Sequence, residues 1–545
     1  MGETFSQDRR GHDPYSFMKF IQSERNSVVN RIINFCASDV RIVAMLLSFT
    51  FSYWMLYIDP AINLDGILYI GAADNLLRGD IQGAYSLYSW LFYPWLIASV
   101  SKLTGLGLES SAHLLTAFFS ALLTYTFITL VRDLGGGRTT ILIAAFVIIF
   151  QPELNETRSS VLRDHGFWAF YLLAILYFVR FCIHPCWRYA LAWNLMIIIA
   201  TLFRIEGVVF LILVPFVFLV YRDWYFLIKI KRFFQVHSLN IVSVIFLFVI
   251  ALCKKEQFYI YSGRLLEPLS RLSMFWEELT VGINEKIEIV QTMLLNSLSD
   301  EYAFTIVLII PIIIFFDKIV KTMTPLYIVI FGYSIFKKKN YFVKKGFSVF
   351  IWVIILNIIM LFVFILPQFF LQSRFVYPLV LILFLMIPFI LTDLYNKWKV
   401  SKTTNSRYRW LFYILCILLV INSLEGLVSL PGCSDSHVKD AGIWLKNNIS
   451  PDARLYTNNA KIKYYRGNFR ERPSGFRQNI TEKQLETIPV NQYDYFALWL
   501  KSKNYPDPQK ILSVFGTTPI QEFRNRENDV VLIYKRGFNA NNSME

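Results

Sequence analysis

The sequence predicts an α-helical polytopic membrane protein with about eleven transmembrane helices, followed by a small soluble α/β domain. Three observations support this fold class. Apolar runs of about 15–20 residues recur along the chain, close to the roughly 20 that a helix needs to cross a bilayer. The short loops between these runs differ in basic content. After Leu430 the composition becomes polar and stays so.

The composition excludes a soluble globular protein. Of the 545 residues, 55% are hydrophobic, and they are gathered in long runs. The net charge of +15 would suit a nucleic-acid partner, but a membrane protein collects Lys and Arg on its cytoplasmic side anyway. We therefore expect membrane lipids as partners and no nucleic acid.

The first elements are a basic, amphipathic inner tail over 1–40, without the features of a cleavable signal peptide, and a first span over 41–58. An acidic, aromatic-rich stretch over 59–110 follows. Its apolar segment 86–100 is short for a span, and its Trp and Tyr residues suit an interface. We expect outer-loop helices here that lie on the membrane surface and do not cross it.

The charges of the loops test this choice. With 86–105 outside the membrane, the inner loops hold 18 Lys and Arg in 61 residues, and the outer loops hold 11 in 125. This difference follows the positive-inside rule, and a crossing at 86–105 would invert it. The inner loops are 132–139, 180–188, 222–238, 337–346 and 393–409, and the outer loops are 59–110, 152–165, 204–206, 254–301 and 367–374.

The remaining spans follow from the apolar runs between these loops. They are predicted at 111–131, 140–151, 166–181, 189–203, 207–221, 239–253, 303–336, 347–366, 375–392 and 410–428. Segment 303–336 contains Pro311 and Pro325 and is either one long broken helix or two short ones. A single crossing is favoured, because an even number of crossings here would place the later basic loops on the outer side.

The membrane part, 41–430, ends at Pro431-Gly432, and residues 431–545 read as the α/β domain. An odd number of crossings places this domain outside. One helix is indicated by Val438, Ala441 and Leu445, which share a face. Strand-like runs lie at 453–457, 493–500 and 529–534, the last preceded by a turn at 525–528.

Four acids gather beside the first span, where carboxylates are costly unless they face water, a partner or a site. Asp65 either caps a short helix through Leu77 or is a reactive carboxylate, and the residues alone leave both interpretations open. Asp80 suits a turn, and Asp74 suits a solvated helix face.

Three more charged clusters lie at outer membrane boundaries. Arg163, Asp164 and His165 precede the fourth span. Arg204 and Glu206 sit in a tight outer turn, where the alternative to a functional role is a local ion pair.

Cys182-Ile-His-Pro-Cys186 offers too few ligands for zinc, which usually takes four.

Arg374 begins a span from the outer side and is followed by Tyr377. An arginine on the less basic side of a membrane suits an anionic partner such as a lipid phosphate, because its guanidinium forks onto phosphate oxygens. Snorkelling to the headgroups is the alternative.

At these residues the chain resembles the GT-C class of membrane glycosyltransferases, in particular the bacterial group related to protein O-mannosyltransferases and the lipid A aminoarabinose transferase. The resemblance covers roughly 42–400. It is carried by Asp65 with Tyr69, Tyr93-Pro94-Trp95, Arg163-Asp164, Phe203-Arg204-Ile205-Glu206-Gly207 and Arg374-Phe375-Val376-Tyr377-Pro378.

The resemblance implies an inverting glycosyltransferase of the bacterial inner membrane with a periplasmic C-terminal domain. It would move a sugar from a polyprenyl-phosphate donor to a hydroxyl of a glycolipid, such as lipopolysaccharide, or of a protein. The implied roles are general base for Asp65 with support from Asp164, donor-phosphate binding for Arg374, Arg163 and Arg204, and substrate binding for Tyr69, Glu206 and Tyr377. Several relatives have a second acid after the base, where this chain has Gly66. A divalent metal stays open, although no metal motif is visible.

Two other classes also stay open. One is a lipid-linked saccharide flippase or transporter, and the other is a non-enzymatic envelope assembly protein. The charged clusters share one side of the membrane, whereas a carrier would place charges near the midplane.

Overall fold

The structure is a computed structural model that describes residues 39–220, 225–253, 280–336, 347–401, 406–425, 435–469, 480, 482–505 and 507–536. Several expectations lie outside these residues. They concern most of the N-terminal tail, the inner loop 337–346, much of the outer loop 254–301, and the first residues of the C-terminal domain.

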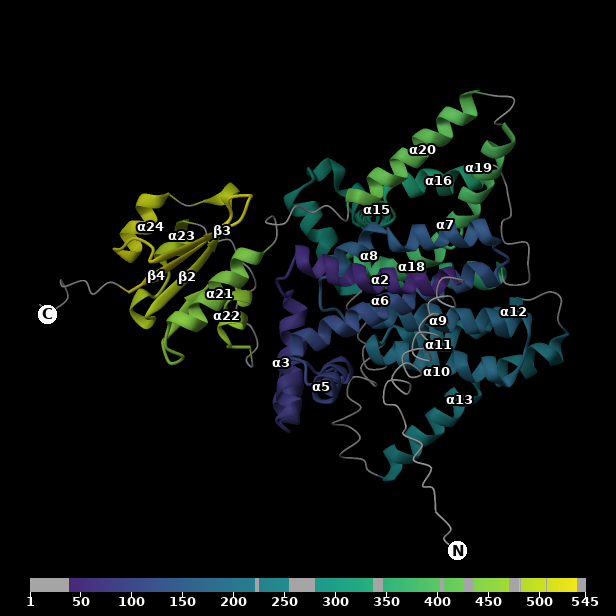
Figure 1. The fold of residues 1–545 in the computed structure, drawn as a ribbon, viewed down its shortest axis with the longest axis horizontal. Helices are drawn as coiled ribbons and strands as arrows, with labels where there is room; N and C mark the ends of the chain where they lie inside the picture. The colour runs from purple at the N-terminus through teal and green to yellow at the C-terminus, as the bar shows by residue number, and fades with distance from the viewer. Residues whose placement is uncertain are drawn as a thin grey trace, which may run out of the picture.

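Five helices of the N-terminal half form the centre of a helical bundle. They run along the long axis of the molecule (Figure 1) and are α2 (Val40–Ile58), α6 (Leu108–Asp133), α7 (Arg138–Ile149), α9 (Asp164–Ile183) and α10 (Trp187–Phe203). α9 packs against both α6 and α10. It is apolar on all sides and most of its side chains are buried, as expected for a helix surrounded by others.

Close packing of α9 on α10 depends on Gly166. A Cβ atom at this position would lie 2.3 Å from the ring of Phe203, at the end of α10. Small residues allow helices in membranes to approach closely, and this is a main source of their association. Gly166 follows Asp164 by two positions, so the approach also brings the start of α9 to the end of α10.

The second half of the bundle is built from shorter and broken helices. α18 and α19 are bent by 41° at the break between them. A further helix covers 280–293. The named elements are α8 (Pro152–Thr157), α11 (Gly207–Leu213), η1 (Val214–Phe216), α12 (Val217–Val220), α13 (Phe226–Cys253), η2 (Ser297–Tyr302), α15 (Ala303–Met323), α16 (Pro325–Phe336), α17 (Phe347–Gln368), α18 (Ser373–Phe384), α19 (Ile387–Ser401) and α20 (Ser406–Glu425).

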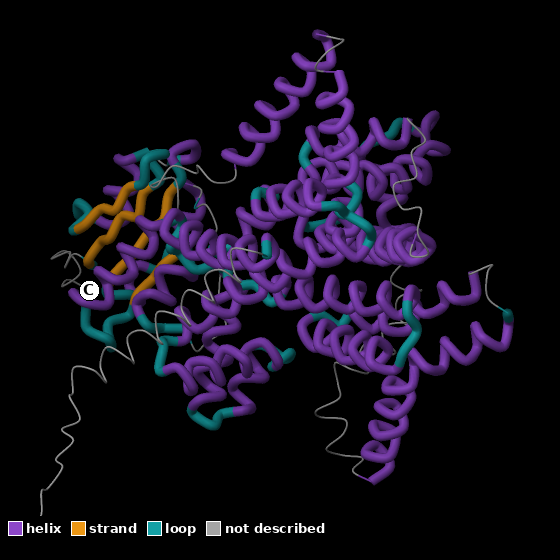
Figure 2. Tube along the Cα trace, turned by 45° about the vertical axis from the view of Figure 1, so that its right-hand side comes forward, coloured by secondary structure: helices purple, strands orange, loops and turns teal. Residues whose placement is uncertain are grey.

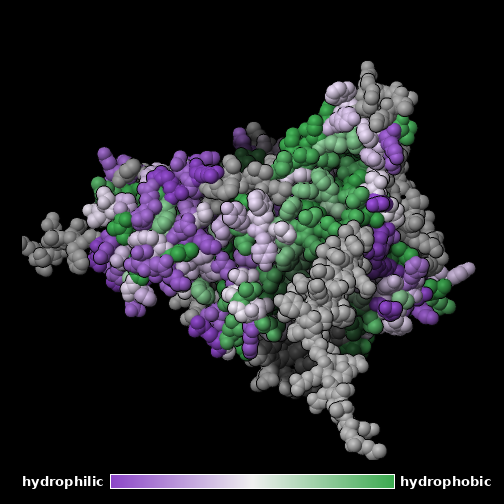
Figure 3. All heavy atoms as spheres, viewed as in Figure 1, coloured by the Kyte–Doolittle hydropathy of each residue, from purple (hydrophilic) through white to green (hydrophobic). Residues whose placement is uncertain are grey.

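The bundle has the character of a membrane protein. Among the described residues, five helices are long and apolar enough to cross a bilayer, and the bent pair α18–α19 makes a sixth. The other predicted spans coincide with helices that are shorter or only partly described, such as α7, α10 and α13. Figure 3 shows hydrophobic residues over the bundle, between a hydrophilic C-terminal unit and a hydrophilic opposite end. The predicted fold class, a polytopic helical membrane protein, is confirmed.

Segment 303–336 consists of two helices. α15 ends at Met323, Thr324 has a φ of 64°, and α16 begins at Pro325. A left-handed threonine and a proline together end one helix and start the next. Of the two alternatives, the structure has two helices, although α15 is 21 residues long.

The stretch between the first two spans forms surface helices across one end of the bundle. α3 (Leu64–Leu77) runs nearly perpendicular to α2 and α6 (Figure 1), and α4 (Ile81–Leu87) and α5 (Phe92–Thr104) pack beside it. α5 has 13 residues, about 20 Å of helix, which is too short to cross. This length fits the prediction that the segment does not cross, and its place on the membrane surface stays a prediction.

All the strands described lie in one C-terminal unit (Figure 2). They are β1 (Leu455–Thr457), β2 (Tyr495–Leu500), β3 (Gln521–Arg524) and β4 (Val530–Lys535), and the sheet order is β1-β2-β4-β3. β1 and β2 are parallel, and the other two pairs are antiparallel. Three strands coincide with the predicted runs. β3 was not predicted because it is a short, charged edge strand.

The sheet is covered on both faces. Alternate residues of β2 and β4 point to opposite sides, so that Phe496 and Leu498 belong to one buried cluster and Trp499 to another. α21 (Ser436–Asn448) and α22 (Ala460–Arg466) contribute to the second cluster, and α24 (Pro508–Phe515) contributes to the first. The remaining short elements are α23 (Glu482–Glu486), η3 (Val490–Gln492) and η4 (Ser502–Asn504).

Candidate active site

Four helix starts meet at the end of the bundle that carries α3. Asp65 lies in the first turn of α3, Asp164 begins α9, Glu206 directly precedes α11, and Arg374 lies in the first turn of α18. Acidic groups are favoured at helix N-termini, where the backbone N–H groups are unpaired. The structure therefore brings together four of the charged clusters found in the sequence.

Arg374 joins the two aspartates. Its Nη1 forms an ion pair with Asp65 and lies 3.9 Å from Asp164 Oδ2. The side chain of Arg374 is 22% exposed and that of Asp65 is 36% exposed. The guanidinium of Arg374 therefore has carboxylate partners within the protein, and snorkelling is not needed to explain its position.

Asp65 does not act as the cap of α3. The N-cap residue is Asn63, and the Asp65 carboxylate receives a hydrogen bond from the Arg374 guanidinium. Of the two interpretations left open by the sequence, the contact with Arg374 favours a role in a charged site.

Asp164 is buried between two arginines. Its side chain is 1% exposed and pairs with Arg204, with Arg374 farther away. A buried charge is tolerated only when it is paired and hydrogen-bonded. Asp164 therefore serves as the counter-charge that holds both guanidinium groups in place.

Arg204 forks onto Glu206. Its Nη2 lies 2.6 Å from Oε1 and its Nε lies 3.4 Å from Oε2. Burial would raise the pKa of the Glu206 carboxyl, but the charge of Arg204 outweighs it, and the pKa is held below its usual range. The local ion pair anticipated from the sequence is present, and through Arg204 it is connected to Asp164.

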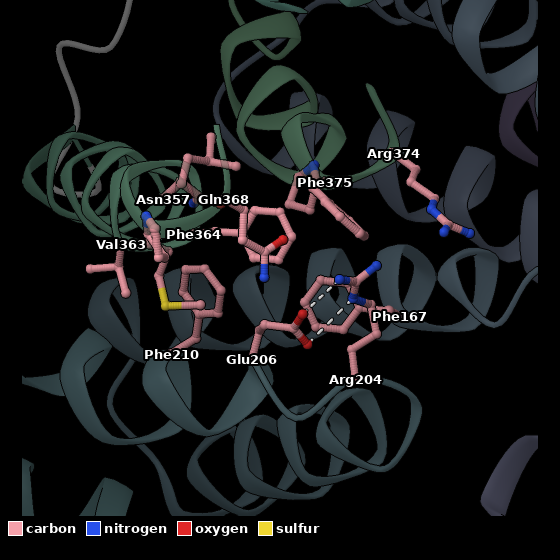
Figure 4. A pocket seen from close by; sticks show the side chains of 14 residues that line it. Phe167, Arg204, Glu206, Phe210, Asn357, Val363, Phe364, Gln368, Arg374 and Phe375 are labelled. Carbon is pink, nitrogen blue, oxygen red and sulfur yellow. Dashed lines mark hydrogen bonds and ion pairs between the residues drawn. The ribbon is translucent and has the colours of Figure 1, made fainter. Parts of the chain in front are cut away.

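A cavity of about 270 Å³ opens beside these charges. Figure 4 shows Arg204 and Glu206 on one wall, with Arg374 and Phe375 opposite them. The Phe375 ring lies under both guanidinium groups, 4.5 Å from Arg204 Cζ and 5.3 Å from Arg374 Cζ. The wall is mostly apolar and consists of Phe167, Arg204, Glu206, Phe210, Asn357, Met360, Leu361, Val363, Phe364, Pro367, Gln368, Arg374, Phe375 and Pro378.

Five predicted site residues lie outside this cavity wall. Asp65 and Asp164 adjoin it through their contacts with Arg374, and the other three have separate surroundings. Tyr69 is buried and packs edge-on against Tyr88 and Tyr93. Tyr377 is buried against Trp168, with ring centroids 4.4 Å apart. The Arg163 guanidinium lies 5.8 Å from the Tyr88 ring centroid. Their proposed contacts with substrate stay predictions.

The other acids near α3 have local partners. Asp74 pairs with Arg78 at 2.9 Å, and the Asp80 carboxylate accepts a hydrogen bond from Gly83 N at the start of α4. Asp74 therefore lies on a mostly covered helix face, with its side chain 16% exposed, and Asp80 caps α4 where a turn was predicted.

Two side chains near the site had no role assigned from the sequence. Phe375 follows Arg374 directly, and this adjacency is a signal that could have been used. Asn63 bonds Val161 twice, with Oδ1 accepting from N at 2.8 Å and Nδ2 donating to O at 3.2 Å. No sequence pattern indicates a partner about a hundred residues away.

No three His, Cys, Asp or Glu side chains are arranged to hold a metal ion in the part of the chain that the structure describes. No family model matches the sequence, and no curated protein matches it either. Among solved structures, the fold is similar to the crystal structure of ArnT from Cupriavidus metallidurans in the apo state. The TM-score is 0.47 at 14% identity, over 93% of this chain and 98% of that chain.

Proposed function

We propose that this protein is an inverting glycosyltransferase that takes a sugar from a polyprenyl-phosphate donor and transfers it to an acceptor hydroxyl. The observation that carries the proposal is the position of Arg374. It links a half-exposed carboxylate, Asp65, to a buried one, Asp164, at the rim of an apolar cavity.

The cavity suits an anionic lipid. Its walls are mainly aromatic and aliphatic, which favours an isoprenoid chain, and arginine lies at the rim, which favours a phosphate. Arg374 has a donor to spare, because its Nε is buried without a hydrogen-bond partner among the described residues. A phosphate oxygen placed there would satisfy this N–H group.

Arg204 supports the site without being the main phosphate ligand. Its Nη1 faces Asp164, and its Nη2 and Nε face Glu206. Of the two arginines at the cavity, Arg374 is therefore the better placed to bind the phosphate. We propose that Arg204 fixes Asp164, which in turn orients Arg374.

Asp65 is the proposed general base. The ion pair with Arg374 occupies this carboxylate, but a donor phosphate would compete for the same guanidinium. Binding of the donor would thus loosen the hold on Asp65 while the acceptor arrives. A positioned base typically contributes about 10²–10⁴-fold in rate.

The reaction balances without a further reactant. Asp65 takes the proton of the acceptor hydroxyl, whose oxygen forms a bond to the anomeric carbon. The bond from this carbon to the phosphate oxygen breaks, and its electron pair leaves with the polyprenyl phosphate. Arg374 stabilises the negative charge that develops on the leaving phosphate. A single displacement inverts the anomeric carbon.

The cellular setting belongs to the same proposal. We place the protein in a bacterial inner membrane, with residues 431–545 as a periplasmic domain and a glycolipid or protein as acceptor. The threefold difference in basic density between loops supports this orientation.

The test is product formation by the purified protein with a polyprenyl-phosphate sugar. Asp65→Asn keeps the shape but removes the base, so turnover should fall about a hundredfold or more. Donor binding should not weaken, because the carboxylate that competes with the phosphate for Arg374 is removed. Asp80→Asn is the matched control, because asparagine can cap α4 as aspartate does, and it should retain activity. An active Asp65→Asn enzyme would exclude this base, and transport without a covalent product would contradict the function.

A further inference from the structure

The C-terminal unit contacts the loop that leads into Asp65. The hydroxyl of Tyr465, on α22, accepts a hydrogen bond from Ile62 N at 2.8 Å. The same hydroxyl lies 3.3 Å from Pro60 O and 3.4 Å from Glu109 Oε1, either of which can accept its hydrogen. Tyr465 thus binds the loop three residues before Asp65.

Lys439, on α21, holds the same loop. Its Nζ donates to Pro60 O at 3.1 Å and lies 3.9 Å from Glu109 Oε1. It also lies 5.2 Å from the centroid of the Tyr465 ring, a cation–π distance. Two elements of the C-terminal unit therefore converge on one backbone carbonyl beside α3.

The contact is apolar and close. Ile62 and Ile67 pack in one buried cluster with Tyr464 and Tyr465. A Cβ atom at Gly71 would lie 2.4 Å from the backbone oxygen of Phe469. Such a close backbone approach indicates that the segment just after α22 packs tightly on α3.

The loop is also held from the membrane side. Asn63 bonds the backbone of Val161, three residues before Asp164. The segment before Asp65 is thus fixed to the bundle on one side and to the C-terminal unit on the other. Asp65 follows this segment directly, so the two attachments help to fix where α3 begins relative to Arg374.

We propose that Tyr465 is a positioning residue, with Lys439 as its second hold, and that docking of the C-terminal unit fixes Asp65 in its catalytic position. This inference rests on the proposed function only for the role of Asp65. The physical reason is geometric: a displacement of about 1 Å in a reacting group can cost on the order of a hundredfold in rate.

The test compares two neighbouring tyrosines. Tyr465→Phe removes the hydroxyl that binds Ile62 N. Tyr464→Phe removes a hydroxyl that bonds Glu109 Oε2 at 2.8 Å, and it leaves the contacts of Tyr465 and Lys439 with the 60–63 loop in place. Tyr465→Phe should speed hydrogen exchange at the Ile62 amide and lower kcat about tenfold, with the KM for the donor unchanged. Tyr464→Phe should change neither quantity by more than about twofold.

The two readouts separate the possible failures. Unchanged exchange at Ile62 in Tyr465→Phe would overturn the positioning role, and so would faster exchange with an unchanged kcat. If the wild-type protein forms no product, faster exchange still supports the hold on the loop, and the proposed function fails by itself. If Tyr465→Phe does not fold, Lys439→Met gives the same test, with faster exchange in the loop and a lower kcat expected.

Discussion

Asp65 and Asp164 both face Arg374, and their exposure separates their roles. The side chain of Asp164 is 1% exposed, whereas that of Asp65 is 36% exposed. A hydroxyl from solvent or from a membrane acceptor can reach Asp65. Asp164 is enclosed by guanidinium groups and offers its charge only to them. This difference in exposure supports the proposed division of roles, with Asp164 as a fixed counter-charge and Asp65 as the group that takes a proton.

Arg374 should bind the donor phosphate, and two substitutions distinguish charge from geometry. Arg374→Lys keeps the charge but loses the planar fork, so donor affinity should fall and part of the activity should remain. Arg374→Ala should lose much more, because Asp65 and Asp164 then lack a shared counter-charge. The measurement is donor binding to each purified variant.

The matched control is Arg78→Ala. Arg78 is exposed at the C-terminal end of α3 and pairs with Asp74, so donor affinity should stay at the wild-type value. Donor affinity that is also unchanged in Arg374→Ala would exclude the phosphate role and leave the Asp65 contact as a structural ion pair.

At the scale of elements, the apolar runs were enough to place most helices. A run such as 111–131 has no other stable form in a bilayer than a helix, because its backbone groups must bond within the segment. The predicted spans therefore coincide with helices. The short apolar run before Lys102 corresponds to the short helix α5. The edge strand β3 was not predicted, because its alternating charged residues have a low preference for strands.

Which elements contact one another could not be predicted from the sequence. Asp65 and Arg374 are 309 residues apart, and nothing in either motif identifies the other as its partner. Arg158 shows the same limit. Its buried guanidinium bonds Ser48, Ser52 and Asn155 and attaches α2 to the C-terminal end of α8, which nothing in the local sequence indicates. Local patterns predict elements, whereas tertiary packing chooses the partners.

The carboxyl group of Glu153, on α8, predicts that the stability of the folded protein depends on pH. Burial raises the pKa of the Glu153 carboxyl from 4.5 to about 7, and the nearby Glu156 adds to this. The folded protein therefore binds a proton at pH values where the unfolded chain has lost it. The stability that the neutral carboxyl contributes is present below about pH 4.5 and is lost as the pH rises to about 7.

Glu153→Gln should remove this dependence, because the amide stays neutral. We expect it to stabilise the protein at about pH 8, on the order of 1–3 kcal/mol, and to change little at about pH 5. Thermal melts at the two pH values measure the difference. Glu156→Gln, at an exposed position, should show a much smaller dependence. An equal shift for Glu153→Gln at both pH values would rule out the buried carboxyl as the cause.

For the whole molecule, the site and the C-terminal unit lie at the same end of the bundle. α22 packs on α3, and α3 carries Asp65. Whichever side of the membrane holds the C-terminal unit therefore also holds the proposed reaction. The basic loops 132–139 and 393–409 flank the other ends of α7 and α19, which predicts that the site faces away from the cytoplasm.

Two lysines at opposite ends of the bundle make this sidedness measurable. Lys102 is exposed near the end of α5, and Lys399 is exposed near the end of α19. In a background with the native cysteines replaced, Lys102→Cys should react with a membrane-impermeant maleimide in intact cells. Lys399→Cys should react only after the membrane is opened, and a denatured sample controls for the reactivity of each thiol. Labelling of Lys399→Cys in intact cells, with Lys102→Cys protected, would place the site in the cytoplasm. A polyprenyl-phosphate donor would then have to be used on the inner leaflet, and the periplasmic setting proposed for the reaction would be wrong.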